Sequence, residues 1–165
     1  MYCSLLDAIG NTPLIRVTFD TPAIICAKPE YLNPGGSVKD RSAHYMIEQA
    51  EKQGILKPGG TIIDASSGNQ GTATAMIGAL KGYKVIITVS EKISEEKLKA
   101  IQAYGAQTVM CPNVEFLEDP RSYHSQAKKL PALSQTYTHR RPFCFGFLPV
   151  IRLYFQCKER NILKC

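Results

Sequence analysis

Hydrophobic and polar positions over residues 55–111 follow two alternating patterns, one typical of strands and one typical of helices. Three β-branched runs predict strands at 61–65, 84–90 and 107–111. Between them, small apolar residues predict a helix over 71–82, and Ser94 caps a second helix that ends at Gly105. Strands alternating with helices of this length imply βαβ units with right-handed crossovers. The predicted fold class is α/β with a parallel sheet.

A further amphipathic helix is predicted within and after NPGGSVKDRSA (33–43), with Ser37 as its N-cap. Its apolar residues recur at helical spacing, at Ala43, Met46, Ile47 and Ala50. Lys39 heads this stripe, so its amine is expected to face the core beside the positive end of the helix, where the neutral form is favoured. Such an amine is a candidate nucleophile for a Schiff base. The alternative is a lysine that extends along the helix edge to solvent.

A second candidate site is SSGNQG (66–71), between a predicted strand and a predicted helix. Ligands of α/β sheets bind at the carboxyl ends of strands, and first-turn N–H groups of a helix suit a carboxylate or a phosphate. Ser66 and Ser67 add hydroxyl groups, Asn69 adds an amide, and the two glycines permit close approach of the backbone. The alternative is a simple turn of Ser, Asn and Gly.

Composition narrows the class of protein. The 165 residues, 44% hydrophobic and 21% charged, are typical of one soluble globular domain. Neither a membrane-length apolar run nor a signal peptide is found, so we expect a cytoplasmic protein without membrane contact. The six cysteines show no metal-ligand spacing, which predicts reduced thiols and no metal centre.

Charge and pattern both change towards the C-terminus. Residues 139–165 contribute +5 of the net charge of +6, so the main body is nearly neutral and a nucleic-acid partner is not expected. After about residue 130 no clear strand–turn–helix signal remains. This segment is interpreted either as an ordinary closing strand or helix, or as a foreign terminus.

Several motifs in register resemble the fold type II pyridoxal-phosphate enzymes, especially the cysteine synthase and cystathionine β-synthase group. They are IGNTPLIR (9–16), KPEYLNPGGSVKDRSA (28–43), KPGGTIIDASSGNQG (57–71), the stretch 91–109 and DPRSYHSQAKKL (119–130). The resemblance implies the N-terminal part of a tryptophan synthase β-like architecture. Residues 1–35 are then expected to belong to the larger domain of relatives, residues 36–130 to the small α/β domain and its flanks, and the tail 131–165 to lie outside the family pattern.

The resemblance also implies a role for each motif residue. Lys39 is expected to be catalytic and to form the Schiff base with pyridoxal phosphate, and Asn69 to hydrogen-bond the ring hydroxyl oxygen. Four loop residues are expected to hold the carboxylate of an amino-acid substrate: Ser66, Ser67, Gly68 and Gln70. Gln70 stands where the family more often has Thr.

The implied activity is β-replacement on an O-activated serine, with O-acetylserine and sulfide giving cysteine. Serine plus homocysteine giving cystathionine is the alternative, and a non-catalytic fragment or binding module is the rival from another class. The expected partners are an amino acid and a thiol or sulfide, with a homodimer as in relatives. The family's Gly/Thr-rich phosphate loop and the Ser or Thr at the pyridine nitrogen are not found, so we expect the N-terminal half of such an enzyme.

Overall fold

The computed structural model describes residues 2–130 and 136–138. Its centre is a parallel sheet in the order β5-β4-β3-β6. The strands are β3 (Thr61–Ala65), β4 (Lys84–Ser90), β5 (Gln107–Cys111) and β6 (Thr136–Thr138). The first three coincide with the strands predicted from the sequence, and the α/β class with a parallel sheet is confirmed.

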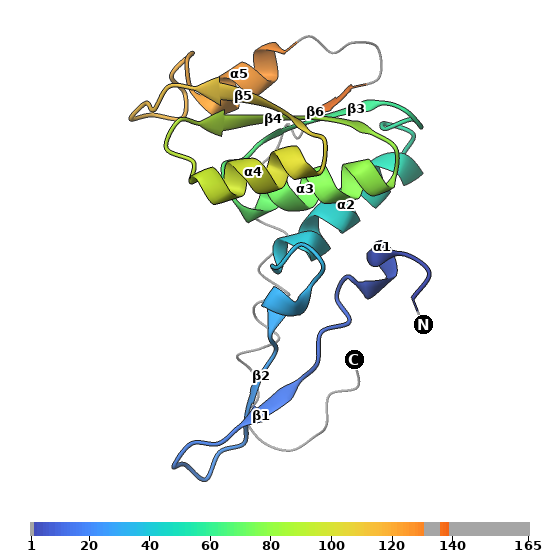
Figure 1. Cartoon of the computed structure of the whole chain (residues 1–165), viewed down its shortest axis with the longest axis vertical. Helices are drawn as coiled ribbons and strands as arrows, with labels where there is room; N and C mark the ends of the chain where they lie inside the picture. Colours follow the sequence, from blue (N-terminus) through green and yellow to red (C-terminus); the bar gives the residue numbers. More distant parts are fainter. Residues whose placement is uncertain (1, 131–135, 139–165) are drawn as a thin grey trace.

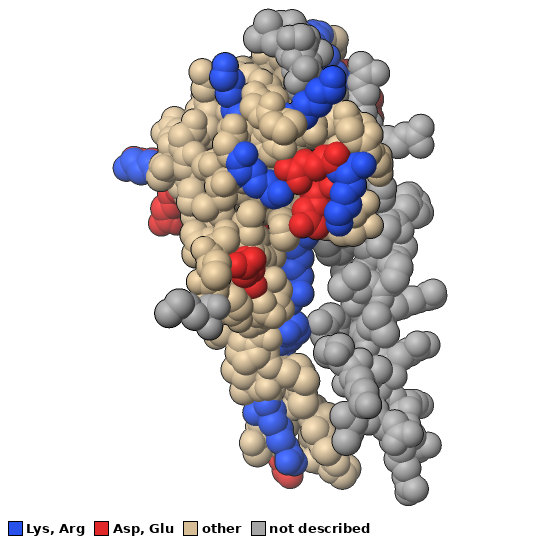
Figure 2. All heavy atoms as spheres, turned by 90° about the vertical axis from the view of Figure 1, so that its right-hand side faces the viewer, with Lys and Arg blue, Asp and Glu red and all other residues tan. Residues whose placement is uncertain are grey.

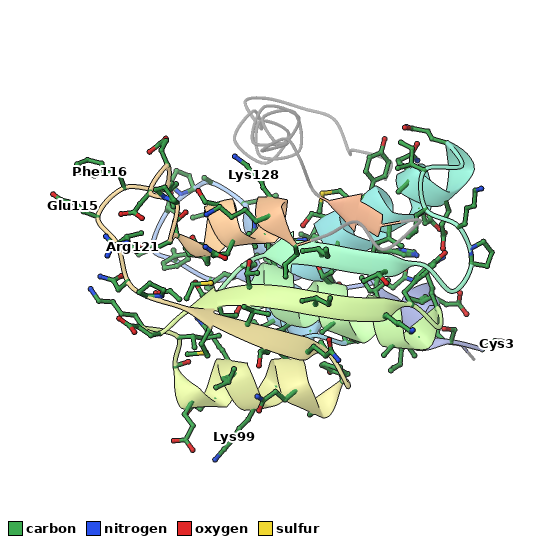
Figure 3. All side chains as sticks on the ribbon, turned by 90° about the horizontal axis from the view of Figure 1, so that it is seen from above. Cys3, Lys99, Glu115, Phe116, Arg121 and Lys128 are labelled. Atoms are coloured by element: carbon green, nitrogen blue, oxygen red, sulfur yellow. The ribbon has the colours of Figure 1, made fainter. Side chains whose placement is uncertain are left out.

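Helices cover both faces of this sheet (Figures 1 and 3). The helices are α2 (Lys39–Lys52), α3 (Asn69–Leu80), α4 (Glu95–Ala103) and α5 (Tyr123–Lys129). α3 and α4 lie on one face with α2 packed alongside α3, whereas α5 lies on the other face. The chain runs from β3 through α3 to β4 and through α4 to β5, so each crossover buries a helix against the strands that it joins.

α3 is the central helix of the core. Ala73, Ala75, Met76 and Ile77 are all buried, as expected for a helix without a polar face. Its small residues allow it to lie close to the sheet, because a Cβ added at Gly78 would collide with the Val85 side chain of β4. The small apolar residues of this helix therefore indicate close packing on the sheet, not an amphipathic helix with one face in solvent.

The N-terminal segment lies apart from the sheet. It contains α1 (Leu5–Ala8), β1 (Ile15–Val17), β2 (Ile25–Ala27) and the 3₁₀ helix η1 (Glu30–Leu32). β1 and β2 pair antiparallel in a hairpin that extends away from the sheet in Figure 1. Large apolar side chains of this hairpin are exposed, among them Leu14, Phe19 and Ile24.

β6 corrects the expectation that no strand signal follows residue 130. It pairs in parallel with β3, with Thr61 opposite Thr136, and so extends the sheet beyond β3. Three residues at a sheet edge are too short a run to be recognised by periodicity. The rest of the segment 131–165 lies outside the described residues.

The following features of the described residues concern membranes, thiols, metals and charge. No helix in the described part of the chain is long and apolar enough to cross a membrane. Cys3, Cys26 and Cys111 are free thiols, and residues 2–130 bring together no His, Cys, Asp and Glu cluster that could hold a metal ion. Acidic and basic side chains are interspersed on the face shown in Figure 2. In Figure 3, Lys99 and Lys128 lie on opposite sides of the sheet, so these two charges belong to different faces.

Candidate active site

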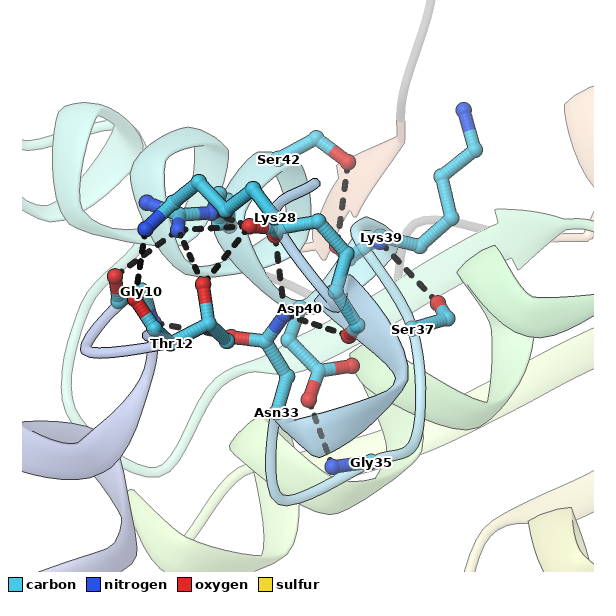
Figure 4. Close-up of polar contacts among 11 residues, drawn as sticks. Gly10, Thr12, Lys28, Asn33, Gly35, Ser37, Lys39, Asp40 and Ser42 are labelled. Carbon is cyan, nitrogen blue, oxygen red and sulfur yellow. Dashed lines mark hydrogen bonds and ion pairs between the residues drawn. The ribbon is translucent and has the colours of Figure 1, made fainter. Parts of the chain in front are cut away.

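The first turn of α2 carries the candidate amine. The helix begins at Lys39, and the Ser37 hydroxyl oxygen accepts a hydrogen bond of 3.0 Å from the Lys39 N–H. Ser37 therefore caps the helix start through its side chain, although Val38 occupies the N-cap position. In Figure 4, the Lys39 side chain extends away from the polar contacts around Asp40 and Asn33.

The predicted inward orientation of Lys39 is wrong in this chain, because its side chain is exposed. Asp40 heads the buried stripe instead, with an exposed fraction of 0%, and Ala43 and Ile47 follow it. Residues 39 and 40 both stand at helical spacing from Ala43, so the apolar pattern alone does not distinguish them. The edge position that was the alternative for Lys39 is the one observed.

Asp40 fixes the glycine turn before the helix. Its Oδ2 accepts a 2.5 Å hydrogen bond from the Gly35 N–H, and a Cβ added at Gly35 would lie 2.5 Å from Oδ1. Burial raises the pKa of this carboxyl, and the bond from Gly35 opposes that effect. Gly36 follows with a φ of +79°, which favours glycine. The PGG turn and the start of α2 are thus one packed unit.

Arg41 joins α2 to two earlier segments. Its Nε donates to Glu30 Oε2 at 2.7 Å, and its Nη2 donates to Glu30 Oε1 at 2.9 Å and to the Gly10 carbonyl at 2.7 Å. Thr12 donates to the same Glu30 carboxylate at 2.8 Å, and Asn33 does so at 3.0 Å (Figure 4). The bond from Arg41 is the largest cause that lowers the pKa of Glu30, to about 2. We call these residues, Gly10, Thr12, Glu30, Asn33 and Arg41, the arginine cluster.

The loop 66–71 turns from β3 into α3, as predicted. α3 begins at Asn69, two residues before the predicted start, with Gly68 as its N-cap. The Ser66 hydroxyl oxygen accepts from the N–H groups of Gly68, at 3.4 Å, and Gly71, at 3.0 Å. A Cβ at Gly71 would lie 2.8 Å from the Ser66 carbonyl oxygen, so the close approach requires glycine. Ser66 thus organises the loop itself.

The donors expected at this helix start are present. The N–H groups of Asn69 and Gln70 have no acceptor among the described residues, as is usual for a first helical turn. The Asn69 side chain is exposed, and Ser67 is half-buried. These groups can hold an anion at the carboxyl end of β3.

Gln70 brings the two candidate motifs together. The Ser42 hydroxyl lies 2.9 Å from Gln70 Oε1 and 3.0 Å from the carbonyl oxygen of Lys39. The turn that carries Lys39 and the loop 66–71, which we call the anion loop, are therefore neighbours. The Gln70 side chain contacts α2 and α3, whereas its N–H belongs to the open first turn of α3.

Sequence reasoning missed the supporting residues Glu30, Asp40, Arg41 and Ser42. The available signal was the position of Asp40 within SVKDR, three residues before Ala43 and therefore on the same helix face as the apolar stripe. The partners of these supporting residues, up to 31 residues away in the sequence, could not be read from local patterns.

The sequence and fold of the chain are similar to those of known proteins. The family described as "Pyridoxal-phosphate dependent enzyme" matches residues 5–144, beyond the limit near residue 130 at which the family pattern was expected to end. A cystathionine beta-synthase of Apis mellifera is 47% identical over 131 residues, covering 76% of this chain and 26% of the relative. A cysteine synthase 1 of Emericella nidulans is 42% identical over 128 residues, covering 76% of this chain and 34% of the relative.

Two solved structures are also similar. O-ureido-L-serine synthase matches with a TM-score of 0.64 and 43% identity, over 68% of this chain and 36% of that one. A hydrogen sulfide-producing enzyme from Fusobacterium nucleatum matches with a TM-score of 0.74 and 33% identity, over 84% and 45% of the two chains. The chain spans less than half the length of each of these proteins. From its family match and these relatives, the chain belongs to the pyridoxal-phosphate-dependent enzymes.

Proposed function

We propose that this chain supplies the lysine and the substrate-carboxylate loop of a pyridoxal-phosphate-dependent β-replacement enzyme. The observation that carries the proposal is the contact between Ser42 and Gln70, because it joins the Lys39 turn to the anion loop. An amine beside a carboxylate site is the arrangement that an amino-acid enzyme with a carbonyl cofactor needs.

The donor set fits the aldehyde end of the cofactor. Lys39 offers an exposed primary amine, and Asn69 offers an exposed carboxamide. A Cβ added at Gly68 meets no described atom within 4 Å, so the backbone of the loop borders open space. Lys39 would hold the aldehyde carbon, and Asn69 would hydrogen-bond the ring hydroxyl oxygen.

The remaining groups would act on the substrate. Pyridoxal phosphate supplies an electron-withdrawing ring that takes up the electron pair of a Cα–H bond. The N–H groups of Asn69 and Gln70, with the Ser67 hydroxyl, would hold the carboxylate and so fix the position of the α-carbon. The Lys39 amine would move the proton at that carbon. Ser66, as the internal cap, would keep the loop in its binding conformation.

The leading reaction is that of O-acetylserine with sulfide to give cysteine. Formation of cystathionine from serine and homocysteine is the second candidate, favoured by the 47% identity to a cystathionine beta-synthase. Since the chain spans 26–34% of these curated relatives, the complete activity, the amino-acid and thiol partners and a homodimer are proposals.

The test is a trapping experiment on the purified chain. It is incubated with pyridoxal phosphate, reduced with borohydride and mapped by peptide mass spectrometry, with turnover assayed in parallel for both substrate pairs. Preferential labelling of Lys39, and its loss in Lys39→Arg, supports the proposal. Labelling of Lys28 or Lys57 with Lys39 unmodified contradicts it. Lys39 labelling without either product supports instead the alternative of a cofactor-binding module that does not turn over.

A further inference from the structure

Gln70 takes part in a chain of hydrogen bonds that crosses from α2 to β3. Ser42 contacts Gln70 Oε1 at 2.9 Å, and Gln70 Nε2 lies 3.4 Å from Thr74 Oγ1. Thr74 donates to Asp64 Oδ2 at 2.8 Å, and both of these residues are buried. At the other end, Ser42 contacts the Lys39 carbonyl at 3.0 Å.

The available donors and acceptors fix the direction of each hydrogen bond in this series. A carboxylate only accepts, so the Thr74 hydroxyl proton is directed to Asp64 and its oxygen is left as an acceptor. The group of Gln70 that faces Thr74 must then be the Nε2 donor, which places the Oε1 acceptor against Ser42. The amide orientation is therefore determined by Asp64 through Thr74, and the Ser42 hydroxyl proton is shared between Oε1 and the Lys39 carbonyl.

These polar contacts lie beside an apolar junction. A small cavity between α2, β3 and α3, lined by Ala43, Ile47 and Ile62 and by Asp64, Gln70 and Thr74, holds about 10 Å³. That volume is at the lower limit for one water molecule. The hydrogen bonds of Gln70 to Ser42 and Thr74 lie beside this largely apolar lining and are partly buried, so they can set how the first turn of α2 sits against the loop.

We propose that Gln70 is a positioning residue that acts on Lys39 through Ser42. In this proposal the Ser42–Gln70 bond sets the distance between the Lys39 amine and the carboxylate loop. The importance of that distance rests on the proposed function. The same proposal assigns the carboxylate contact at this position to the Gln70 N–H rather than to its amide side chain, which is already bonded to α2 and Thr74.

The test compares Ser42→Ala, Gln70→Ala, the double variant and Ser42→Thr, which keeps the hydroxyl. Gln53→Ala removes an amide from the end of the same helix and is the matched control. The first readout is amide hydrogen exchange in peptides covering 39–46 and 66–74. The second is the ratio of Lys39 to Lys97 labelling by pyridoxal phosphate and borohydride, with Lys97 as the exposed reference.

Loss of the Ser42–Gln70 hydrogen bond is expected to raise exchange about fivefold in both peptides for Ser42→Ala, and at least as much for Gln70→Ala, which also loses the contact with Thr74. The double variant is expected to show no increase beyond that of Gln70→Ala. Ser42→Thr and Gln53→Ala are expected to remain at the wild-type rate, and the labelling ratio is expected to fall in the variants that lose the bond. Exchange that rises in one peptide only, additive effects, or failure of Ser42→Thr to restore the wild-type rate would overturn the proposal. So would weaker binding of O-acetylserine in Gln70→Ala with no effect of Ser42→Ala, because that result indicates direct substrate contact.

The two proposals fail in different ways. If Lys39 is labelled no faster than Lys97 in the wild-type chain, the proposed function is wrong, and the exchange measurements still decide whether Gln70 links the two segments. If Lys39 is labelled preferentially and both exchange and labelling are unchanged in the variants, the function stands and the positioning role is wrong.

Discussion

Arg41 and Glu30 form a bidentate ion pair, in which Arg41 Nε lies 2.7 Å from Glu30 Oε2 and Arg41 Nη2 lies 2.9 Å from Glu30 Oε1. The same guanidinium reaches the Gly10 carbonyl, so the segments around residues 10, 30 and 41 meet at one side chain. Arg41 lies two residues after Lys39. The pair therefore holds the start of α2 to the N-terminal segment, whose Leu6 and Ile9 also pack against the core.

Removal of the Arg41 side chain is expected to destabilise the chain. Arg41→Ala leaves the Glu30 carboxylate and the Gly10 carbonyl without their charged donor, and a loss of about 2 kcal/mol in the free energy of unfolding is expected. Arg41→Lys keeps the charge but not the planar fork, so it should recover only part of that loss. Urea unfolding at pH 7 measures the stability loss of both variants. Arg121→Ala is the control, since Arg121 pairs with nearby Asp119 at the surface, and this variant should leave the midpoint unchanged. Equal midpoints for Arg41→Ala and wild type would contradict this role.

The contribution of Glu30 should depend on pH in a defined direction. Its folded pKa of about 2 is below the ordinary value of 4.5, so the carboxylate stabilises the fold above pH 4.5. That contribution is lost as the pH falls from 4.5 towards 2. Glu30→Gln should therefore be less stable than wild type at pH 7, and the difference should shrink between pH 4.5 and 2. Asp40 contributes with the opposite sign, since burial and, to a smaller extent, the charge of Glu30 raise its pKa, and Glu30→Gln removes the second of these causes. Unfolding curves at pH 7, 5 and 3 test this, and a constant difference would contradict it.

The local sequence pattern was sufficient to predict the βαβ core, but it was insufficient to predict the orientation of the Lys39 side chain. β3, β4 and β5 were predicted to the residue because each is a β-branched run between turn signals. α3 begins two residues early because Ser66 caps the Gly71 N–H, which extends the helix back to Asn69. Lys39 and Asp40 were equally compatible with the apolar stripe, and the Gly35 N–H decided between them.

The missed parts depend on contacts between distant segments. Arg41 joins residues that are 11 to 31 positions away from it, and nothing in the periodicity of either segment indicates its partner. β6 pairs with β3 across most of the domain sequence, and its three residues carry no period of their own. The two motifs were predicted to form one site, whereas the side chains that link them, Ser42 and Gln70, were not.

The Tyr83 hydroxyl is expected to lose its proton at a higher pH than an ordinary tyrosine. Its hydroxyl donates to Glu51 Oε1 at 2.6 Å, while Lys81 donates to Oε2 at 2.8 Å. Burial and the bond to Glu51 raise the pKa of Tyr83 to about 12. The stabilisation is therefore complete below pH 10 and is lost as the pH rises from 10 to 12. Phenolate absorbance should show a phase near pH 12 that Tyr83→Phe removes. Tyr45→Phe, at an exposed position, should keep that phase. Retention of the phase in Tyr83→Phe would contradict the assignment.

Gly71→Ala tests whether the anion loop depends on close backbone approach. Alanine favours a helix over glycine by about 1 kcal/mol, so helix propensity alone predicts a more stable chain. The added Cβ would instead lie 2.8 Å from the Ser66 carbonyl oxygen and 3.2 Å from the Ile87 side chain. The loop must therefore move away from α3, which weakens the bond from the Gly71 N–H to Ser66 Oγ. A net loss of about 1–2 kcal/mol in unfolding free energy is expected, of the size that overpacking causes.

The matched control for that substitution is Gly68→Ala in the same loop. Gly68 has an extended backbone, and its added Cβ meets no described atom within 4 Å, so the folded chain should tolerate alanine there. Urea unfolding gives the stability of each variant, and pyridoxal phosphate trapping at Lys39 gives the state of the site. We expect Gly71→Ala to lower both. Gly68→Ala should keep the stability and lower only the binding of an amino-acid carboxylate, because its methyl group projects into the space that borders the loop. If Gly71→Ala is as stable as wild type, the 2.8 Å approach does not constrain the loop, and the organising role of Ser66 is wrong.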